Sequence, residues 1–301
     1  MADEVDRDVA RALARGGRSP DPAGQVAAVN DRTGAGLTLV GAAEHGDSGG
    51  ALYVRWPDGR DGVLTRTPAS ADRMRLTAEV LAEVRAAGLP VPRHDLIVEL
   101  GGGVVAVVQE RLPGSPARKL DAATIDAMAA VNERFAGLLT DRPEVPVPAL
   151  RIGPDQPDPM SAARLAEHSP RTRRMLQRIR EIGESAPAEI AGDDLLHPDL
   201  TIGNILYESG QVTGVVDWNW GVERGDRHFA LLKIYIDLFW NTGGADQAAW
   251  DRLDALVEER IEPDRLTAYW AGLTLGQLSY WVMEDSPKAV EIFLRFGDYR
   301  L

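Results

Sequence analysis

The sequence contains no cysteine among its 301 residues. The chain therefore has no disulfide, no thiolate nucleophile and no cysteine-ligated zinc site. It has 5 histidines, and no two of them have the spacing of a zinc site. No apolar run is long enough to cross a membrane, and the acidic start Met1-Ala2-Asp3-Glu4 does not resemble a signal peptide. These absences predict a cytoplasmic protein with no membrane partner.

Positive charge is also scarce, with 33 Lys and Arg against 46 Asp and Glu and a net charge of −13. Proteins that bind a phosphate backbone usually carry a basic face, so we expect no nucleic acid partner. An acidic surface would attract a cationic small molecule, but it would equally keep the protein in solution, and both explanations stay open. The length suffices for one large domain or two lobes, and the composition does not determine the oligomeric state.

The most informative stretch runs from Leu195 to Leu206. In it Asp199 is followed by Asn204 five places later, and a predicted hairpin with its turn at 208–211 then leads to Asp217. Phosphoryl transfer from a nucleotide needs a carboxylate that accepts the proton of the acceptor hydroxyl. It also needs a carboxamide and a second carboxylate as hard oxygen ligands for Mg²⁺. The sequence offers these three groups in that order.

The stretch from His197 to Asn204, followed by Asp217-Trp218, resembles the aminoglycoside phosphotransferase family. In protein kinases an Arg stands at the position of Pro198, and Phe-Gly follows the metal-binding Asp. The resemblance extends more weakly from Leu37 to Tyr299. It implies a bilobal kinase-like α+β fold, with a small N-terminal β-rich lobe and a larger, mostly helical C-terminal lobe. It further implies ATP, or alternatively GTP, together with Mg²⁺, and it implies Asp199 as the catalytic residue and Asn204 and Asp217 as metal ligands.

Three regions follow from this interpretation. Residues 1–33 are expected to be a mobile leader, 34–113 the nucleotide-binding lobe, and 114–301 the catalytic and acceptor-binding lobe. The elements expected in the first lobe are strands at 36–41, 51–56 and 62–66, a helix at 71–87 and a hairpin with strands at 96–100 and 104–108. The helices expected in the second lobe are 121–139, 159–168, 171–184, 227–240, 246–258, 263–283 and 287–296.

A glycine-containing loop precedes the second predicted strand. Its amides from about His45 to Gly50 would cover nucleotide phosphates, which makes Ser48 and Gly49 candidates for nucleotide binding. The same residues match the Gly-x-Ser-x-Gly pattern of serine hydrolases. That motif lies between a strand and a helix, whereas a strand is predicted to follow here, so serine hydrolysis is the weaker alternative.

A kinase small lobe also carries a Lys on its third strand, paired with a Glu on the next helix. Here Thr65 occupies the position of that Lys, and Arg66 should point to the other face of a regular strand. Either Arg66, paired with Glu79 or Glu83, replaces the Lys, or the site holds the phosphates with less help. Both glutamates are equally consistent with ordinary solvent-exposed charges on a helix. We retain Arg66 and Glu79 as nucleotide-binding candidates.

Five further residues are candidates for the site. Glu110 and Leu112 lie in the predicted hinge, where the backbone of relatives meets adenine. Trp218 and Trp220 follow a metal-site Asp and are candidates for the acceptor pocket, with core packing as the alternative. Asp237 is a candidate acid for binding a cationic acceptor.

The segment Gly225-Asp226 resembles the start of the family's Gly-Asp-x-x-x-Asp-Leu pattern, in which Ala230 replaces the second Asp. We expect altered support for the catalytic loop and no loss of chemistry, with Asp226 capping the next helix. The sequence thus predicts an ATP/Mg-dependent phosphotransferase that acts on a hydroxyl of a small molecule, and the resemblance implies that this molecule is an aminoglycoside or another antibiotic. The alternatives are a kinase for choline, homoserine or a sugar, and a pseudokinase-like nucleotide-binding protein.

Overall fold

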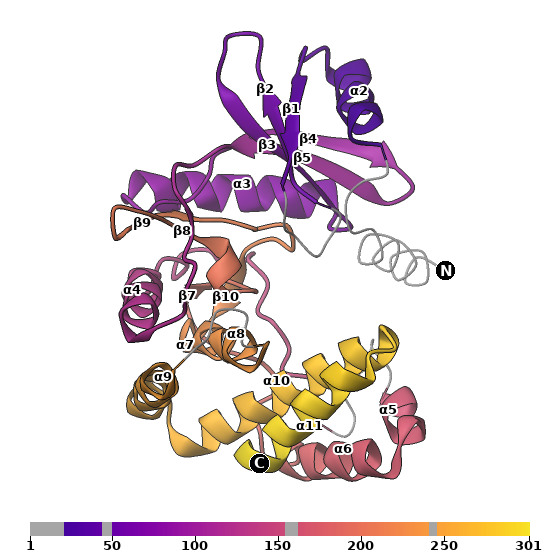
Figure 1. The fold of residues 1–301 in the computed structure, drawn as a ribbon, viewed down its shortest axis with the longest axis vertical. Helices are drawn as coiled ribbons and strands as arrows, with labels where there is room; N and C mark the ends of the chain where they lie inside the picture. The colour runs from indigo at the N-terminus through magenta and orange to yellow at the C-terminus, as the bar shows by residue number, and fades with distance from the viewer. Residues whose placement is uncertain (1–20, 44–49, 154–161, 241–245) are drawn as a thin grey trace. The chain divides into compact units, whose positions relative to one another are not determined.

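The structure is a computed structural model that describes residues 21–43, 50–153, 162–240 and 246–301. Its chain divides into two compact units. The first contains the residues up to Pro116 and, later in the chain, Gly203–Val222. The second contains Ala117–Ile202 and Glu223–Leu301. The predicted combination of a unit built on an antiparallel sheet and a mainly helical unit is confirmed (Figure 1).

The first unit is built on a five-stranded antiparallel sheet with the strand order β1-β2-β3-β5-β4. Helices α2 and α3 cover opposite faces of this sheet (Figure 1). On one face Val29 of α2 packs in a cluster with Leu64, and on the other Met74 of α3 packs with Val107. The elements are α2 (Pro22–Thr33), β1 (Thr38–Ala42), β2 (Leu52–Arg55), β3 (Asp61–Thr67), α3 (Ala71–Ala86), β4 (His94–Gly101) and β5 (Val104–Glu110).

Helix α2 lies in the segment that the sequence assigned to the leader. Asp21 caps the helix by accepting a hydrogen bond from the amide of Gly24, and Gly34 ends it in a left-handed conformation. Val26 and Val29, three residues apart, lie on one face of the helix and are buried against the sheet. The helix was missed because two valines in a polar segment indicate burial only once the sheet provides a partner surface.

The turn between β4 and β5 has the predicted glycine hairpin. Gly101, Gly102 and Gly103 have φ angles of 88°, 62° and 76°. Residues with a Cβ rarely adopt this left-handed region in succession, so three glycines at one point specify the reversal. The prediction of two strands around these glycines is confirmed, although β4 and β5 both extend beyond the predicted ends.

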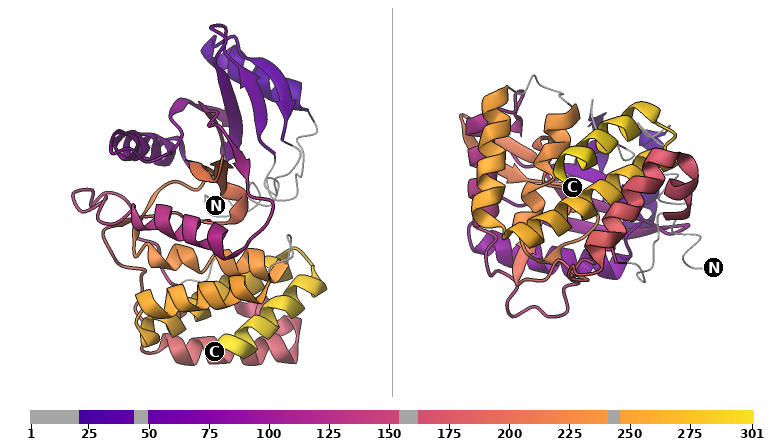
Figure 2. Two further views of the ribbon diagram at one scale, coloured as in Figure 1. Left: turned by 60° about the vertical axis from the view of Figure 1, so that its left-hand side comes forward. Right: turned by 90° about the horizontal axis from the view of Figure 1, so that it is seen from below.

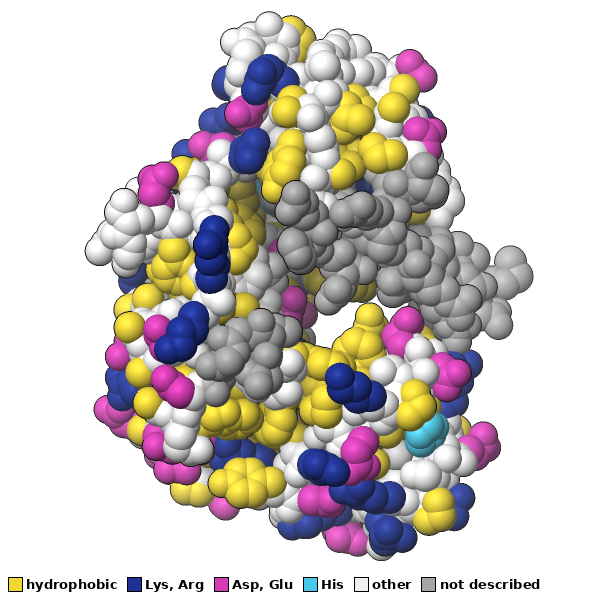
Figure 3. All heavy atoms as spheres, in the orientation of Figure 1, with side chains coloured by type: hydrophobic (Ala, Val, Ile, Leu, Met, Phe, Trp, Pro, Cys, Tyr) yellow, Lys and Arg dark blue, Asp and Glu magenta, His cyan; other side chains and the backbone are white. Residues whose placement is uncertain are grey.

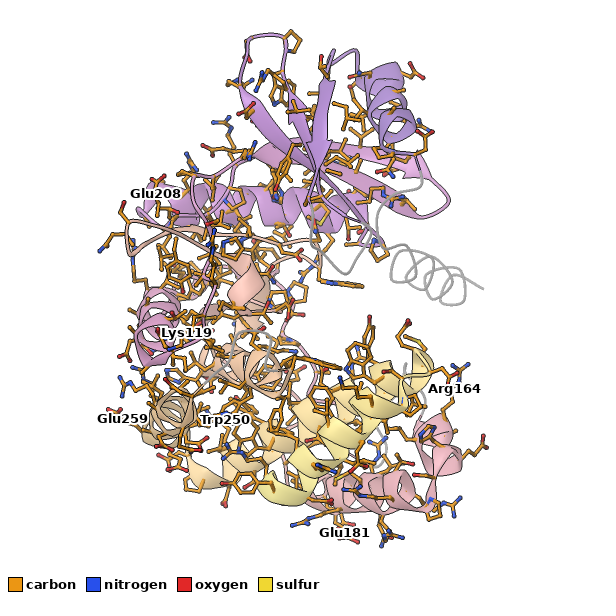
Figure 4. The ribbon with its side chains drawn as sticks, in the orientation of Figure 1. Lys119, Arg164, Glu181, Glu208, Trp250 and Glu259 are labelled. Atoms are coloured by element: carbon orange, nitrogen blue, oxygen red, sulfur yellow. The ribbon has the colours of Figure 1, made fainter. Side chains whose placement is uncertain are left out.

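The hairpin after the central motif belongs to the first unit. Strands β8 (Ile205–Glu208) and β9 (Gln211–Val215) are joined by Ser209 and Gly210, whose φ angles are 52° and 77°. Two left-handed residues in a two-residue connection are typical of the turn that matches strand twist, so the predicted hairpin is confirmed. The short strand β6 (Ser115–Pro116) extends it to three strands, and the 3₁₀ helix η1 (Ile202–Asn204) precedes it. Glu208 lies at the end of β8 (Figure 4).

In the residues that the structure describes, the second unit is mainly helical and contains one short strand pair, β7 with β10, and an isolated bridge between Ala149 and Glu189. Helices α10 and α11 pack side by side (Figure 2). Four helices of this unit contribute to an aromatic cluster in which Tyr235 contacts Trp250, Trp270 and Phe296. Trp250 of this cluster is labelled in Figure 4. The elements are α4 (Ala122–Glu133), α5 (Ala162–His168), α6 (Pro170–Gly183), β7 (Asp194–Leu196), β10 (Glu223–Gly225), α7 (His228–Leu231), α8 (Ile234–Trp240), α9 (Gln247–Arg260), α10 (Pro263–Met283) and α11 (Pro287–Arg300).

Most predicted helices of this unit are present, with corrections at their ends. Helix α10 has the predicted bounds, and Asp121 is the N-cap of α4, accepting a hydrogen bond from the amide of Thr124 at 3.0 Å. The helix predicted at 227–240 is two helices, α7 and α8, and the one predicted at 121–139 ends at Glu133. Among the described helices, none is both long and apolar enough to cross a membrane.

Candidate active site

The structure brings the two predicted metal ligands together in the first unit. In the hairpin, Ile205 pairs with Val215, and the amide of Val216 donates a hydrogen bond to the carbonyl of Asn204 at 2.9 Å. Asn204 therefore lies beside the residue that directly precedes Asp217. The two-residue turn fixes this register, so the closeness of Asn204 to Asp217 along the backbone follows from local structure.

Asp217 begins a tight segment with an unusual backbone conformation. Its φ is 66°, in the left-handed region that Asp and Asn adopt more readily than other residues with a Cβ. The side-chain amide of Asn219 donates a hydrogen bond to Asp217 Oδ1 at 2.7 Å. The amide of Gly221 then donates to the carbonyl of Trp218 at 2.9 Å and closes the turn. The carboxylate thus extends from a constrained loop directly after β9.

These residues fit a magnesium ion by the chemistry of their donors. Asn204 supplies a carboxamide oxygen and Asp217 a carboxylate, both hard oxygen ligands, and both side chains are only partly buried. Mg²⁺ is commonly bound by one or two protein groups, with substrate phosphates and water completing its shell. The residues that the structure describes contain no group of three or more His, Asp or Glu side chains that could hold a metal ion by themselves. A metal at this site would therefore also need ligands from outside these side chains.

Strand β3 presents Thr65 and Arg66 to opposite faces of the sheet. Thr65 pairs with Val107, which belongs to the cluster beneath α3, and Arg66 pairs with Ala106, which belongs to the cluster beneath α2. The hydroxyl of Thr65 donates to Asn219 Oδ1 at 2.8 Å, so the α3 face carries the Asp217 segment. Thr65, and not Arg66, is therefore on that face. A phosphate contact by Arg66 stays a prediction, and burial lowers the pKa of its guanidinium.

Helix α3 contacts the Asp217 segment through Thr77. This hydroxyl is buried and accepts a hydrogen bond from the amide of Val222 at 3.1 Å. Glu79 and Glu83 are both exposed on the same helix. Of the apolar residues on this helix, Val80 and Val84 are buried, whereas Leu76 is only partly buried. A role for Glu79 at the nucleotide remains a prediction.

The two tryptophans after Asp217 have different environments. The ring of Trp218 is 1% exposed, and its Nε1 donates to the carbonyl of Val215 at 2.9 Å. This side chain packs in the core, which is the alternative that the sequence left open. Trp220 is 54% exposed, so of the two it is the one available to a ligand. Its contact with an acceptor remains a prediction.

The predicted hinge packs against the β8–β9 hairpin. Thr213 Oγ1 donates to the carbonyl of Pro113 at 2.7 Å, and Gly114, with a φ of 93°, approaches the backbone of Tyr207 so closely that a Cβ would lie 2.7 Å from its carbonyl oxygen. At the start of the hinge, Glu110 forms an ion pair with Arg85 at 2.7 Å.

The structure therefore gives the Glu110 side chain a partner within the protein. Leu112 lies near Gly214 of the hairpin, since a Cβ on this glycine would come 3.1 Å from Leu112 Cδ1. Contact of either residue with adenine remains a prediction. The remaining nucleotide candidates, Ser48 and Gly49, lie outside the described residues.

In the second unit, hydrogen bonds to the backbone shape the loop that carries Asp199. His197 is fully buried, and its Nδ1 accepts a hydrogen bond from the amide of Asp199 at 3.0 Å. An accepting Nδ1 requires the neutral imidazole that carries its proton on Nε2. The amide of Thr201 donates to the carbonyl of Asp199 at 2.9 Å. His197 thus braces the loop, and the carboxylate of Asp199 takes no part in these bonds.

The far end of the loop is held by Asp237 of α8, whose Oδ2 accepts a hydrogen bond from the amide of Ile202 at 2.7 Å. Burial raises the pKa of Asp237 to about 7, the Ile202 amide partly opposes this shift, and the charge of Asp199 adds to it. Ala230, which stands where relatives have an Asp, is buried in α7. Asp237, on the next helix, is a carboxylate that supports the loop here. That this support differs from that in relatives stays a prediction. Binding of an acceptor by Asp237 remains a prediction.

This raised pKa predicts how the stability of the protein depends on pH. The unfolded Asp237 loses its proton near pH 3.8 and the folded one near pH 7, so folding binds a proton between these values. The free energy of unfolding should therefore fall from about pH 4 to about pH 7, by at most about 4 kcal/mol from this group. Asp237→Asn keeps an oxygen for the Ile202 amide but cannot ionise.

The measurement is the urea midpoint of wild type and Asp237→Asn at several pH values from 5 to 8. We expect the urea midpoint of Asp237→Asn to increase relative to that of wild type as the pH rises. Parallel curves would contradict the raised pKa.

Strand β7, which leads into His197, is anchored by an ionic network. Asp194 accepts hydrogen bonds from the amide of Gly137 at 2.7 Å and from the guanidinium of Arg227 at 2.8 Å. Arg227 also pairs with Glu133 of α4 at 2.7 Å. Asp226 accepts from the amide of His228 at 2.9 Å, but the N-cap of α7 is Arg227, so the cap predicted at Asp226 is wrong by one residue. The segment that resembles the family pattern therefore positions the strand that precedes the Asp199 loop.

Sequence reasoning missed the partners of the motif residues. Asn219 and Thr77 hold the Asp217 segment, and neither was a candidate. The one available signal was the position of Asn219 two residues after a metal-site Asp, where a short amide can reach the carboxylate.

Comparison with known proteins gives one family and several related structures. The model of the phosphotransferase enzyme family matches residues 42–262. A thermostable mutant of aminoglycoside phosphotransferase APH(4)-Ia, in a ternary complex with ADP and hygromycin B, is 18% identical with a TM-score of 0.62 over 90% of this chain and 95% of that one. No curated protein matches the sequence significantly.

Two further structures are similar at the same 18% identity. The macrolide 2'-phosphotransferase MphH from Brachybacterium faecium has a TM-score of 0.53, covering 91% of this chain and 98% of that one. Aminoglycoside phosphotransferase APH(3'')-Id from Streptomyces rimosus has a TM-score of 0.52, covering 84% and 97%. At this identity the likeness establishes the fold, and it confirms the predicted kinase-like architecture.

Proposed function

Because the chain belongs to the phosphotransferase enzyme family, we propose that it transfers the terminal phosphoryl group of ATP to a hydroxyl of a small molecule. The observation that carries the proposal is the pairing of Asn204 with the residue before Asp217, at 2.9 Å between the carbonyl and the amide. It supports one oxygen-donor site made from a carboxamide and a carboxylate. Such a pair suits the metal that neutralises nucleotide phosphates.

We assign the chemistry to three side chains. Asn204 and Asp217 would hold Mg²⁺, which when bound bridges the phosphates and neutralises their developing charge. Asp199 would orient the acceptor hydroxyl and take its proton. The bonds to His197 and Asp237 use the backbone of the loop, so they position Asp199 without engaging its carboxylate. ATP is favoured because similar structures are described with ADP or AMP-PNP, and GTP is the alternative.

For the acceptor we propose an antibiotic, with an aminoglycoside as the first choice. Similar structures are described as aminoglycoside and macrolide phosphotransferases, one of them with hygromycin B. The net charge of −13 suits a cationic acceptor. On the face drawn in Figure 3, however, acidic and basic side chains are mixed over the helical unit. Steering would therefore come from the summed charge and not from an acidic patch on that face, and a metabolite kinase is the alternative.

A nucleotide-binding protein without turnover is a second candidate. It is favoured by Thr65, which occupies the position where a kinase has its Lys and which bonds to Asn219 instead. Such a protein would bind nucleotide and leave every acceptor unmodified.

The test is incubation with Mg²⁺ and ATP or GTP against a panel of aminoglycosides, macrolides, choline, homoserine and sugars. Mass spectrometry should detect an acceptor heavier by one phosphoryl group, and Asp199→Asn is the matched control with the same shape and no base. Nucleotide binding without any product would favour the second candidate. Covalent labelling of Ser48 by a fluorophosphonate would favour serine hydrolysis.

A further inference from the structure

We propose that Asn219 is a positioning residue for the metal-binding carboxylate of Asp217, and that Thr65 acts through Asn219. The inference rests on the proposed function, because it concerns Mg²⁺ bound at Asp217. It assigns a role to the side chain at the position where a kinase has its Lys. Here that position would serve the metal site by orienting one of its ligands.

The three side chains form a directed chain of hydrogen bonds within the first unit. Thr65 Oγ1 donates to Asn219 Oδ1 at 2.8 Å, and Asn219 Nδ2 donates to Asp217 Oδ1 at 2.7 Å. A carboxylate only accepts hydrogen bonds, so the NH₂ group of Asn219 must face Asp217. The amide oxygen is then turned toward the hydroxyl of Thr65. Each partner selects the same orientation of the amide.

The backbone of Asn219 is held by the same strand. The hydroxyl of Thr67 donates to the carbonyl of Asn219, and Thr67 is fully buried. Thr65 and Thr67 lie two residues apart, so they share one face of β3. Asn219 is thus held through both its main chain and its side chain, which leaves its amide little freedom to turn away from Asp217.

Asp217 needs such a restraint. Its left-handed φ of 66° is costly for a residue with a Cβ, and its side chain is only partly buried, so packing alone does not fix its rotamer. The bond from Asn219 to Oδ1 sets the plane of the carboxylate and therefore the direction in which it presents oxygen to a metal. Groups that orient a metal ligand in this way typically contribute tenfold or more to metal affinity.

The experiment measures Mg²⁺ dependence separately from nucleotide affinity. Calorimetric ADP affinity is recorded without metal and over a Mg²⁺ titration for wild type, Asn219→Ala, Thr65→Val and Thr65→Ser. We expect Asn219→Ala to raise the Mg²⁺ concentration at half-saturation by about 10- to 100-fold, and Thr65→Val by about three- to tenfold. Thr65→Ser keeps the hydroxyl and should behave nearly as wild type. Affinity for ADP without metal should stay unchanged in all of them.

Two controls separate positioning from general stability. Thr33→Val removes a threonine-to-carbonyl hydrogen bond of 2.8 Å in α2 of the same unit, away from the Asp217 segment and the hinge, and it should leave Mg²⁺ dependence unchanged. The double variant Thr65→Val/Asn219→Ala should match Asn219→Ala alone, because Thr65 acts only through Asn219. Additive effects would show that Thr65 acts by another route and overturn that part of the proposal.

The result also distinguishes this proposal from the proposed function. If Asp217→Asn abolishes the Mg²⁺ response while the Asn219 and Thr65 variants respond like wild type, only the positioning role is wrong. If the ADP affinity of wild type does not respond to Mg²⁺, or Asp217→Asn leaves the response intact, both proposals fail. A loss of metal-free affinity as large as the loss with Mg²⁺ would indicate a merely structural effect and overturn the positioning role.

Discussion

Replacing Asp199 by alanine should lower turnover by about 10²–10⁴ and leave the affinity for Mg-ATP almost unchanged. In the proposed reaction its carboxylate takes the proton of the acceptor hydroxyl and does not touch the nucleotide. The fold of the loop should survive, because the hydrogen bonds to His197 and from Thr201 use the amide and the carbonyl of residue 199. The loss should therefore fall on the chemical step.

The measurement is the single-turnover rate beside calorimetric affinity for ATP with Mg²⁺. Asp199→Asn, which keeps the side-chain shape, serves as the control and should lose a comparable amount of turnover. Normal turnover in both variants would remove Asp199 from the mechanism. A large loss of nucleotide affinity in a folded variant would place Asp199 at the nucleotide instead.

Replacing Asp217 should abolish most of the effect of Mg²⁺ on nucleotide binding, and it should lower turnover by about 10³-fold or more. The phosphates would lose their metal bridge to the protein. Asp217→Asn is the sharper variant, because asparagine tolerates the left-handed φ of 66° better than alanine does. Asn204→Ala should give a milder form of the same defect, partly rescued by high Mg²⁺ or by Mn²⁺.

Calorimetric ATP affinity with and without Mg²⁺ tests this prediction, with circular dichroism to establish that each variant is folded. The two substitutions should leave metal-free affinity close to that of wild type. The assignment of the metal ligands would be wrong if Asp217→Asn kept the full Mg²⁺ response. It would be equally wrong if Asp199→Ala and Asp217→Asn lost the same amount of nucleotide affinity.

Features that depend on neighbouring residues were predictable from the sequence. The hairpin after Asn204 needs only two strands and a turn at Ser209 and Gly210, and its register places Asn204 next to the residue before Asp217. The glycine hairpin between β4 and β5 and the cap at Asp121 are likewise local. In each case a backbone preference or a short hydrogen bond acts within a few residues, so the sequence contains the whole cause.

What lies against these local structures was decided by the tertiary structure. Alternation along β3 indicated that Thr65 and Arg66 point to opposite faces, but it could not say which face carries the Asp217 segment. Asn219 reaches Thr65 across 154 residues of chain, and Asp237 reaches Ile202 from a separate helix. Helix α2 packs on the five-stranded sheet, and the sequence of the helix alone does not specify that sheet. Such contacts depend on how helices and strands pack against one another. Which side chains become buried or paired therefore depends on surfaces formed by several segments together.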